Sequence, residues 1–159
     1  MIIRKAKPGD ARRLCELGNQ FLREISAYSP IYKLEKLSVN KKNIASWRNS
    51  VKKPEKNFYT FVAEENGKVL AYLEIIIKEN WPKEYFKVKK YGWIECIVVD
   101  NKIRGKGIGQ TLFDFAMKFF KKNKLKFVRI SFLVKNKYGA NFWKKNKFKE
   151  ESSEMIRKI

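Results

Sequence analysis

Apolar residues recur along this chain with two different spacings, and the spacing changes from segment to segment. Spacing of three or four residues predicts a helix after the turn Pro8-Gly9-Asp10, with Asp10 as its N-cap and Ser29-Pro30 beyond its end. A second helix is expected to begin at Ser38 and to end before Pro54. Two further helices are expected, one directly after Gly107 and a short one through Trp143. These helices account for the segments with helical periodicity.

Alternating or continuous apolar runs predict the strands between these helices. The dipeptide Asn66-Gly67 separates two such runs and predicts a tight hairpin turn. The expected strands are residues 2–6, 58–63, 68–77, 93–99, 128–134 and, at the end of the chain, 148–156. A polar loop is expected at residues 79–90. The resulting order, β-α-α-β-β-β-α-β-α-β, predicts a single α/β domain over residues 1–159 with a mixed sheet.

Between the strand that ends at Val99 and the following helix lies a glycine-rich loop, Arg104-Gly105-Lys106-Gly107-Ile108-Gly109. A strand, a glycine-rich loop and a helix together make an anion cradle, because backbone N–H groups can approach phosphate and the helix directs its positive end toward it. The pattern is not the dinucleotide fingerprint, which needs glycine where Gln110 stands, nor the Walker loop, which needs Ser or Thr where Gly107 stands. The sequence therefore predicts a phosphate-binding loop of another kind.

Composition narrows the function classes. The net charge of +21 is concentrated partly in residues 101–149, where Asp114 is the single acidic residue. A positive field of this kind steers phosphate-bearing small molecules and nucleic acids equally well. Histidine is absent and Cys15 and Cys96 are far apart, so we expect no metal site. Without a signal-like N-terminus or a run of about 20 apolar residues, we expect a cytoplasmic protein without a membrane span.

Three segments together resemble the GNAT superfamily of N-acyltransferases. They are the beginning, IIRKAKPGDARRLCEL, the hairpin VAEENGKVLAYLEI, and the strand and loop WIECIVVDNKIRGKGIGQTL, with its R-x-x-G-x-G pattern. The segment NKYGANFWKKNKF at residues 136–148 resembles the second cofactor segment of the family. It departs from the family pattern at Trp143, where Tyr is usual, and at Lys147, where Gly is usual. The resemblance covers nearly the whole chain.

The resemblance implies acetyl-CoA as cofactor and an amine as acceptor. The cofactor is expected to contact a set of residues on the strand, the loop and the 136–148 segment: Ile97, Val98, Val99, Arg104, Gly105, Lys106, Gly107, Ile108, Gly109, Asn136, Phe142 and Trp143. In the family, a free main-chain N–H of the strand binds the thioester oxygen, which here would belong to Val98 or Val99. Alternatively, Asn136 is a plain cap at the end of a strand.

Glu95 is the expected general base, because it is an acid in an otherwise apolar strand, where burial would make it a better base near neutral pH. Contact with the acceptor, or a pair with a surface lysine, remains an alternative for Glu95, and a small fraction of neutral amine entering directly would need no base. Trp143 cannot release a proton, so Tyr138 is the candidate substitute for the usual acid, with water as the alternative.

The acceptor site is expected between the first helix pair and the loop before the Glu95 strand. Its candidate residues are aromatic: Tyr28, Tyr32, Trp81, Tyr85 and Phe86. The partners are therefore acetyl-CoA and a primary amine of a small molecule or a protein, and the protein is expected to be a monomer or a homodimer. Two alternatives remain open. One is a CoA-binding sensor or adaptor with weak catalysis, and the other is a cationic nucleic-acid-binding protein, for which no motif is found.

Overall fold

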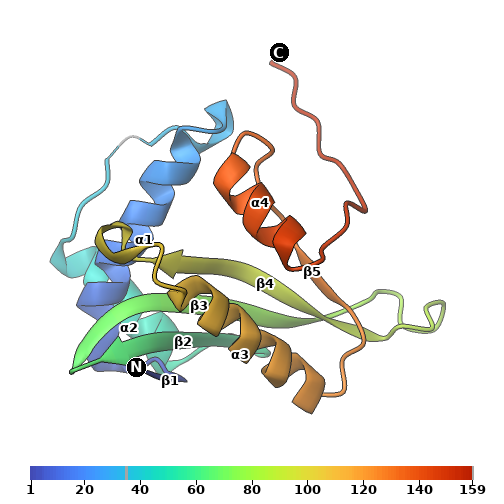
Figure 1. The fold of residues 1–159 in the computed structure, drawn as a ribbon, viewed down its shortest axis with the longest axis horizontal. Coiled ribbons are helices and arrows are strands. Elements are labelled where there is room, and N and C mark those ends of the chain that lie inside the picture. The colour runs from blue at the N-terminus through green and yellow to red at the C-terminus, as the bar shows by residue number, and fades with distance from the viewer. Residues whose placement is uncertain (35, 159) are drawn as a thin grey trace.

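Five strands form one mixed sheet in the part of the chain that the computed structural model describes, residues 1–34 and 36–158 (Figure 1). Their bounds are β1 (Ile2–Lys5), β2 (Phe58–Glu65), β3 (Lys68–Glu79), β4 (Lys90–Val99) and β5 (Val128–Ile130). They lie side by side in chain order. All neighbours are antiparallel except β4 and β5, which are parallel. The expected α/β class with a mixed sheet is confirmed.

Helices cover both faces of this sheet (Figure 1). Their bounds are α1 (Ala11–Ser26), α2 (Lys41–Lys52), α3 (Ile108–Lys122) and α4 (Lys137–Lys145), with short 3-10 turns at Pro8–Asp10, Pro30–Tyr32 and Asn101–Ile103. On one face, Leu14 and Leu17 of α1 are buried against Tyr72 and Val98 of the sheet. On the other face, α3 packs its own apolar side chains against Leu73. The sheet thus separates two apolar cores. None of the helices in the described residues combines the length and the apolar composition that crossing a bilayer requires.

A β-bulge at Glu95 interrupts the register between β3 and β4. Glu74 lies opposite Cys96, and the next residue of β3, Ile75, lies opposite Ile94, so Glu95 is the extra residue of β4. A bulge moves the following side chains to the opposite face. Accordingly Ile94 belongs to the core under α3, and Cys96 belongs to the core under α1.

Beyond this bulge, β4 and β5 separate. Their parallel pairing covers only the three residue pairs that end at Ile94 and Ile130, whereas β4 continues to Val99. The carboxyl-terminal half of β4 therefore has β3 on one side and, among the described residues, no paired strand on the other; we call this unpaired edge the opening. This opening lies at the end of β4 from which the glycine-rich loop leads into α3 (Figure 1).

The hairpin and two of the helix caps test the predicted local structure. The hairpin turn is confirmed, with positive φ angles of 50° at Asn66 and 74° at Gly67. The expected cap Ser38 is wrong: Asn40 caps α2, because its side chain accepts a hydrogen bond from the N–H of Asn43. Asp10 occupies the N-cap position of α1 but makes no side-chain capping bond, because its carboxylate binds Arg4 and the N–H of Lys7.

The carboxyl-terminal strands are shorter than predicted. β5 ends at Ile130 instead of continuing to residue 134, because β4 no longer lies beside it there. The predicted strand at 148–156 is wrong within the described residues, since residues 149–158 have no regular secondary structure. Residues 149–154 read Lys-Glu-Glu-Ser-Ser-Glu, which offers no apolar face to bury.

Candidate active site

The glycine-rich loop between β4 and α3 has the backbone conformation that only glycine adopts easily. Gly105 and Gly107 have φ angles of 82° and 80°, and a Cβ atom built at either position would meet no other atom within 4 Å. The concave side of the loop is therefore open. Gly109 differs, because a Cβ there would lie 3.7 Å from Val99 and 3.9 Å from Phe142. The first two glycines make a cradle, and the third allows close packing of α3.

The amino terminus of α3 leaves its first N–H groups free for a ligand. Gly107 is the N-cap and has no side chain to satisfy these groups. The helix continues for 15 residues, so its dipole adds partial positive charge at the same place. Lys106 is exposed beside it. Backbone donors, helix dipole and lysine together fit the pyrophosphate of a nucleotide-like ligand.

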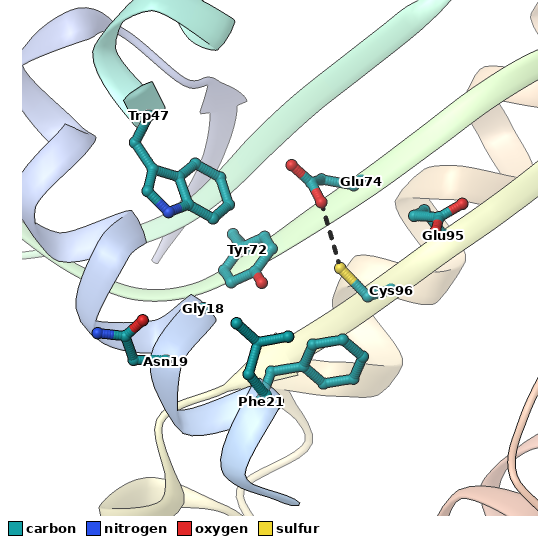
Figure 2. A pocket seen from close by; sticks show the side chains of 9 residues that line it. Gly18, Asn19, Phe21, Trp47, Tyr72, Glu74, Glu95 and Cys96 are labelled. Atoms are coloured by element: carbon teal, nitrogen blue, oxygen red, sulfur yellow. Dashed lines mark hydrogen bonds between the residues drawn. The ribbon is translucent and has the colours of Figure 1, made fainter. Parts of the chain in front are cut away.

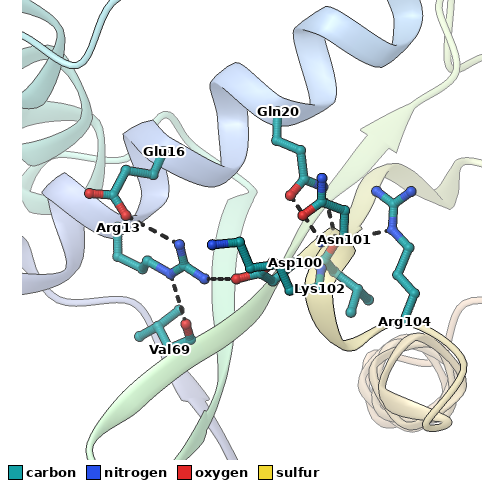
Figure 3. A network of polar contacts seen from close by, with 9 residues as sticks. Arg13, Glu16, Gln20, Val69, Asp100, Asn101, Lys102 and Arg104 are labelled. Atoms are coloured by element: carbon teal, nitrogen blue, oxygen red, sulfur yellow. Dashed lines mark hydrogen bonds and ion pairs between the residues drawn. The ribbon is translucent and has the colours of Figure 1, made fainter.

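A hydrogen-bond network attaches this loop to α1 (Figure 3). Arg13 forms an ion pair with Asp100, and its Nε donates to the carbonyl of Val69 at 3.0 Å. Asp100 also accepts from the N–H of Lys102 at 2.9 Å. Although burial alone would raise the pKa of Asp100, the Lys102 and Arg13 bonds lower it below its ordinary value. Asp100 is thus an ionised anchor between β4 and the 3-10 turn.

Gln20 of α1 and Arg104 of the loop complete this network. The Gln20 amide donates to the carbonyl of Val99 at 3.0 Å and accepts from the N–H of Asn101 at 3.0 Å. Arg104 donates to Val99 at 3.3 Å and pairs with Glu24 at 2.6 Å. Arg104 is one of the residues expected to contact the cofactor, but its guanidinium faces α1 and pairs with Glu24. Its position supports a structural part in holding the loop.

The opening beside β4 exposes main-chain donors of the strand. The N–H of Asp100 donates to the carbonyl of Leu70 at 3.0 Å, which makes these two residues a hydrogen-bonded pair of the antiparallel ladder. Such pairs alternate, so the N–H of Val98 points to β3, whereas those of Ile97 and Val99 point toward the opening. This geometry favours Val99 over Val98 as the donor predicted for a carbonyl oxygen.

A cavity of about 220 Å³ lies on the other side of the bulge, between α1, α2 and the sheet (Figure 2). Its walls come from four elements: Gly18, Asn19, Phe21 and Leu22 of α1, Trp47 of α2, Tyr72 and Glu74 of β3, and Glu95 and Cys96 of β4. The indole of Trp47 packs edge-on against Tyr72, with 5.6 Å between the ring centroids. The cavity is therefore largely apolar, with two carboxylates at its sheet side.

Glu74 is the more deeply placed of these carboxylates. Its oxygens accept long hydrogen bonds, from the Thr60 hydroxyl at 3.4 Å and from the Cys96 thiol at 3.5 Å (Figure 2). No cation pairs with it among the salt bridges of the described residues. Burial, together with the charge of nearby Glu95, raises the pKa of Glu74 to about 7, although its two hydrogen bonds oppose this. Such a carboxylate exchanges protons near neutral pH.

Glu95 lines the same cavity but is exposed rather than buried, contrary to the expectation from the sequence. The bulge is the physical reason, because it takes Glu95 out of the regular alternation of β4. One carboxylate oxygen accepts a hydrogen bond from the Trp93 indole at 2.9 Å, and Lys78 lies 3.7 Å above the same indole. Glu95 is therefore held at the mouth of the cavity.

The five aromatic residues predicted for the acceptor site do not line this cavity. Trp81, Tyr85 and Phe86 project from the loop between β3 and β4 and are 79 %, 83 % and 45 % exposed. Tyr32 is exposed and Tyr28 is half-buried near the end of α1. The cavity is built instead mainly from residues of α1, α2 and β3 that form no local motif in the sequence, together with Glu95 and Cys96 of β4.

The residues predicted on the second cofactor segment lie on α4. Asn136 caps the amino terminus of this helix by accepting from the N–H of Gly139 at 2.9 Å, whereas the alternative considered for it was a cap at the end of a strand. Phe142 and Trp143 pack edge-to-face with Phe113 and, for Trp143, with Phe148. Tyr138 is 70 % exposed. The described contacts of Trp143 are thus those of a packing residue.

Glu74 is the residue that sequence reasoning missed. It lies in the run VLAYLEIII, so it is an acid inside an apolar strand, which is the same signal that drew attention to Glu95. What the sequence lacks is the register that puts Glu74 opposite Cys96 and next to the bulge.

Comparisons with known proteins agree with this geometry. The model of the acetyltransferase (GNAT) family matches residues 21–148. An uncharacterized N-acetyltransferase of Methanocaldococcus jannaschii is 32 % identical over 119 residues, which are 74 % of this chain and 50 % of that protein, so the chain spans half the length of this relative.

Two solved structures share the fold at low sequence identity. A mutant of a Bacillus halodurans protein superposes with a TM-score of 0.85 at 19 % identity, covering 100 % of this chain and 99 % of the other. A predicted acetyltransferase of Clostridium acetobutylicum, solved with acetyl-CoA, gives a TM-score of 0.72 at 18 % identity, with 99 % and 95 % covered.

Proposed function

Because the chain belongs to the acetyltransferase (GNAT) family, we propose that it transfers an acetyl group from acetyl-CoA to a primary amine. Transfer takes place by direct attack of the amine while both substrates are bound. The observation that carries this proposal is the position of the bulge at Glu95. On one side of it, β4 parts from β5 beside the glycine cradle, and on the other side lies the carboxylate-lined cavity.

Acetyl-CoA would be held at the opening beside β4. The loop of Gly105 and Gly107 and the first N–H groups of α3 suit its pyrophosphate, and Lys106 adds charge. Of the residues predicted for this role, Ile97 and Val99 have outward N–H groups suited to a carbonyl oxygen. Ile108, Gly109, Phe142 and Trp143 would form the apolar wall on the side of α3 and α4.

The amine needs a proton acceptor before it can attack, since it is an ammonium ion at neutral pH. The carboxylates of Glu74 and Glu95 are the groups of the cavity suited to this task. The thiol that leaves also needs a proton. Tyr138 is the predicted donor, but at 70 % exposure it lies in contact with solvent, and water at the opening can serve equally.

The first experiment measures heat on mixing the protein with acetyl-CoA at low salt, followed by thiol release with a panel of primary amines. Binding together with amine-dependent thiol release supports acetyl transfer. Binding without turnover for any amine would favour the CoA-binding sensor or adaptor. Binding of the protein to RNA that CoA does not displace, together with no heat on mixing with acetyl-CoA, would favour the nucleic-acid-binding alternative.

A further inference from the structure

The cavity on the α1–α2 side differs in charge from the rest of the molecule. The chain contains 37 Lys and Arg residues against 16 Asp and Glu. Yet among the described residues, the side chains that line the cavity include Glu74 and Glu95 and no Lys or Arg. A ligand with a carboxylate or phosphate near its amine would meet two acids there without a compensating cation.

The remaining walls of the cavity are apolar and set its shape. Phe21, Leu22, Trp47 and Tyr72 surround a space of about 220 Å³. Trp47 closes against Gly18, where a Cβ atom would lie 2.8 Å from the indole. The space suits one short apolar stem, and aromatic walls also favour a cation next to them.

Asn19 is the polar residue in the part of the wall that α1 forms (Figure 2). It lines the cavity and is 7 % exposed, and its Nδ2 has no hydrogen-bond partner within residues 1–34 and 36–158. Buried polar groups are nearly always paired. This Nδ2 atom is itself shielded from solvent, so it is an unsatisfied donor within the wall rather than a contact for a molecule in the cavity.

We infer that this cavity binds a small primary amine on an apolar stem, without an adjacent acidic group, as its ammonium ion between Glu74 and Glu95, and that Glu74 takes its proton. This inference rests on the proposed acetyl transfer and names its substrate class and base. It replaces Glu95, the predicted base, with Glu74. Glu95 becomes the residue that binds the ammonium ion, held in place by the Trp93 indole.

The proton balance is complete without a further residue. One proton moves from the ammonium nitrogen to a Glu74 oxygen, and the nitrogen regains its lone pair. Acetyl-CoA supplies the carbonyl carbon to which nitrogen bonds and the sulfur that leaves with the C–S electron pair. The second amine proton ends on that sulfur, and Glu74 returns the first proton to solvent. The products are an N-acetyl amine, a free thiol and one proton.

The surroundings of Glu74 suit this exchange. The titratable groups that face it are Glu95 and Cys96 on β4 and Tyr72 on β3, while α1 and α2 contribute uncharged walls. Burial and Glu95 raise the pKa of Glu74 to about 7. It therefore holds a proton more readily than an ordinary carboxylate, and an ammonium ion can pass its proton to it at a smaller cost.

Matched substrates test the substrate class on the unaltered protein. Phenylalanine carries a carboxylate that phenethylamine lacks, and 4-aminobutyrate carries a carboxylate where butylamine has its terminal methyl group. We expect kcat/KM to be at least about 100-fold higher for phenethylamine than for phenylalanine, because the carboxylate of phenylalanine would be repelled by the two glutamates in a desolvated site. The second pair should show a smaller ratio, since its carboxylate lies farther from the amine. Equal rates, or faster reaction of the amino acids, would overturn the inference while leaving acetyl transfer intact.

Three variants separate the roles of the carboxylates. Glu74→Gln should lower kcat by about 100- to 10,000-fold and remove the rise of kcat with pH around 7. Glu95→Gln should raise KM for the amine about two- to fivefold with a smaller change in kcat. Glu154→Gln, in the exposed tail, is the matched control and should change neither. A Glu74→Gln variant that keeps its kcat and pH profile would contradict the assignment.

Binding without turnover gives a second readout. Phenethylamine titrated into the protein alone should quench the fluorescence of Trp47, as judged against Trp47→Phe, and binding should weaken in Glu95→Gln. Acetyl-CoA binding, measured by calorimetry, should be the same in the wild type and all three glutamate variants. If the wild type did not bind acetyl-CoA, the proposed function itself would be overturned. An amine that does not bind while acetyl-CoA does would overturn the inference alone.

Discussion

The two sides of the Glu95 bulge use opposite sources of charge. The cradle beside α3 is positive through backbone N–H groups, a helix terminus and Lys106, and none of its glycines contributes a side chain. The cavity beside α1 is negative through two carboxylates set among aromatic and aliphatic side chains. Under the proposed function, a polyanionic substrate and a cationic one would therefore bind in two regions of opposite charge. The net charge of +21 has the same sign as the cradle and gives no indication of the negative cavity.

The largest effect is expected when the cradle is blocked by Gly107→Val. At a φ of 80° a β-branched residue strains the turn, and its side chain occupies the space that phosphate would need. We expect acetyl-CoA affinity to fall more than about 100-fold, measured by calorimetry, because several charge-assisted bonds are lost. Gly67→Val is the matched control, since Gly67 has a φ of 74° and equally open surroundings but lies in the β2–β3 turn. Equal loss of affinity in both variants would contradict the cradle.

The next test concerns the cost of keeping Glu74 in the cavity. Its pKa is about 7 in the folded protein and near 4.5 in an unfolded chain, so the folded state holds more protons between these values. Stability therefore falls as pH rises through this window. Glu74→Gln should stabilise the protein at pH 8 by as much as about 3 kcal/mol relative to wild type, and the gain should vanish near pH 4. Urea unfolding at both pH values measures this difference. A variant that is less stable than the wild type at pH 8 would contradict an unfavourable environment for the ionised Glu74.

A smaller effect is expected where α1 holds the loop. The pKa of Asp100 is lowered by its bonds to Lys102 and Arg13, against the effect of burial. Its contribution to stability is therefore present above about pH 4 and is lost as the pH falls through the lowered value. Asp100→Asn should cost about 1 to 2 kcal/mol at pH 7 and weaken acetyl-CoA binding modestly, as the loop loses its anchor. An unchanged midpoint of thermal unfolding would show that the ion pair contributes nothing.

The smallest change is expected for Trp143→Tyr. This substitution restores the residue usual in the family, and activity should stay the same or rise. Trp143 packs against Phe113, Phe142 and Phe148, so the smaller ring should cost about 1 kcal/mol of stability. Steady-state turnover and thermal unfolding measure the two effects separately. A large loss of turnover with little change in stability would show that the indole shapes the substrate opening.

The comparison also explains which part of the site could be predicted from the sequence. The cradle is local: a strand, glycines at positive φ and a helix follow one another within residues 93–122, so the sequence pattern contains all of it. The cavity assembles α1, α2, β3 and β4, and Glu74 meets Cys96 and Glu95 there because of the register between β3 and β4 at the bulge. Single-chain periodicity holds no information about that register. The same reason explains the wrong length of β5, which ends where its neighbour departs.

Helix α1 contributes to both regions at once. Its inner face supplies Gly18, Phe21 and Leu22 to the cavity. Gln20 of the same helix hydrogen-bonds the backbone of Val99 and Asn101 beside the cradle. Any shift of this helix that tightens one region must therefore be felt in the other. Thermodynamic linkage then requires reciprocity: if bound acetyl-CoA changes the affinity for the amine by some factor, the amine changes the affinity for acetyl-CoA by the same factor. We therefore expect any coupling between the two proposed substrates to be transmitted through α1.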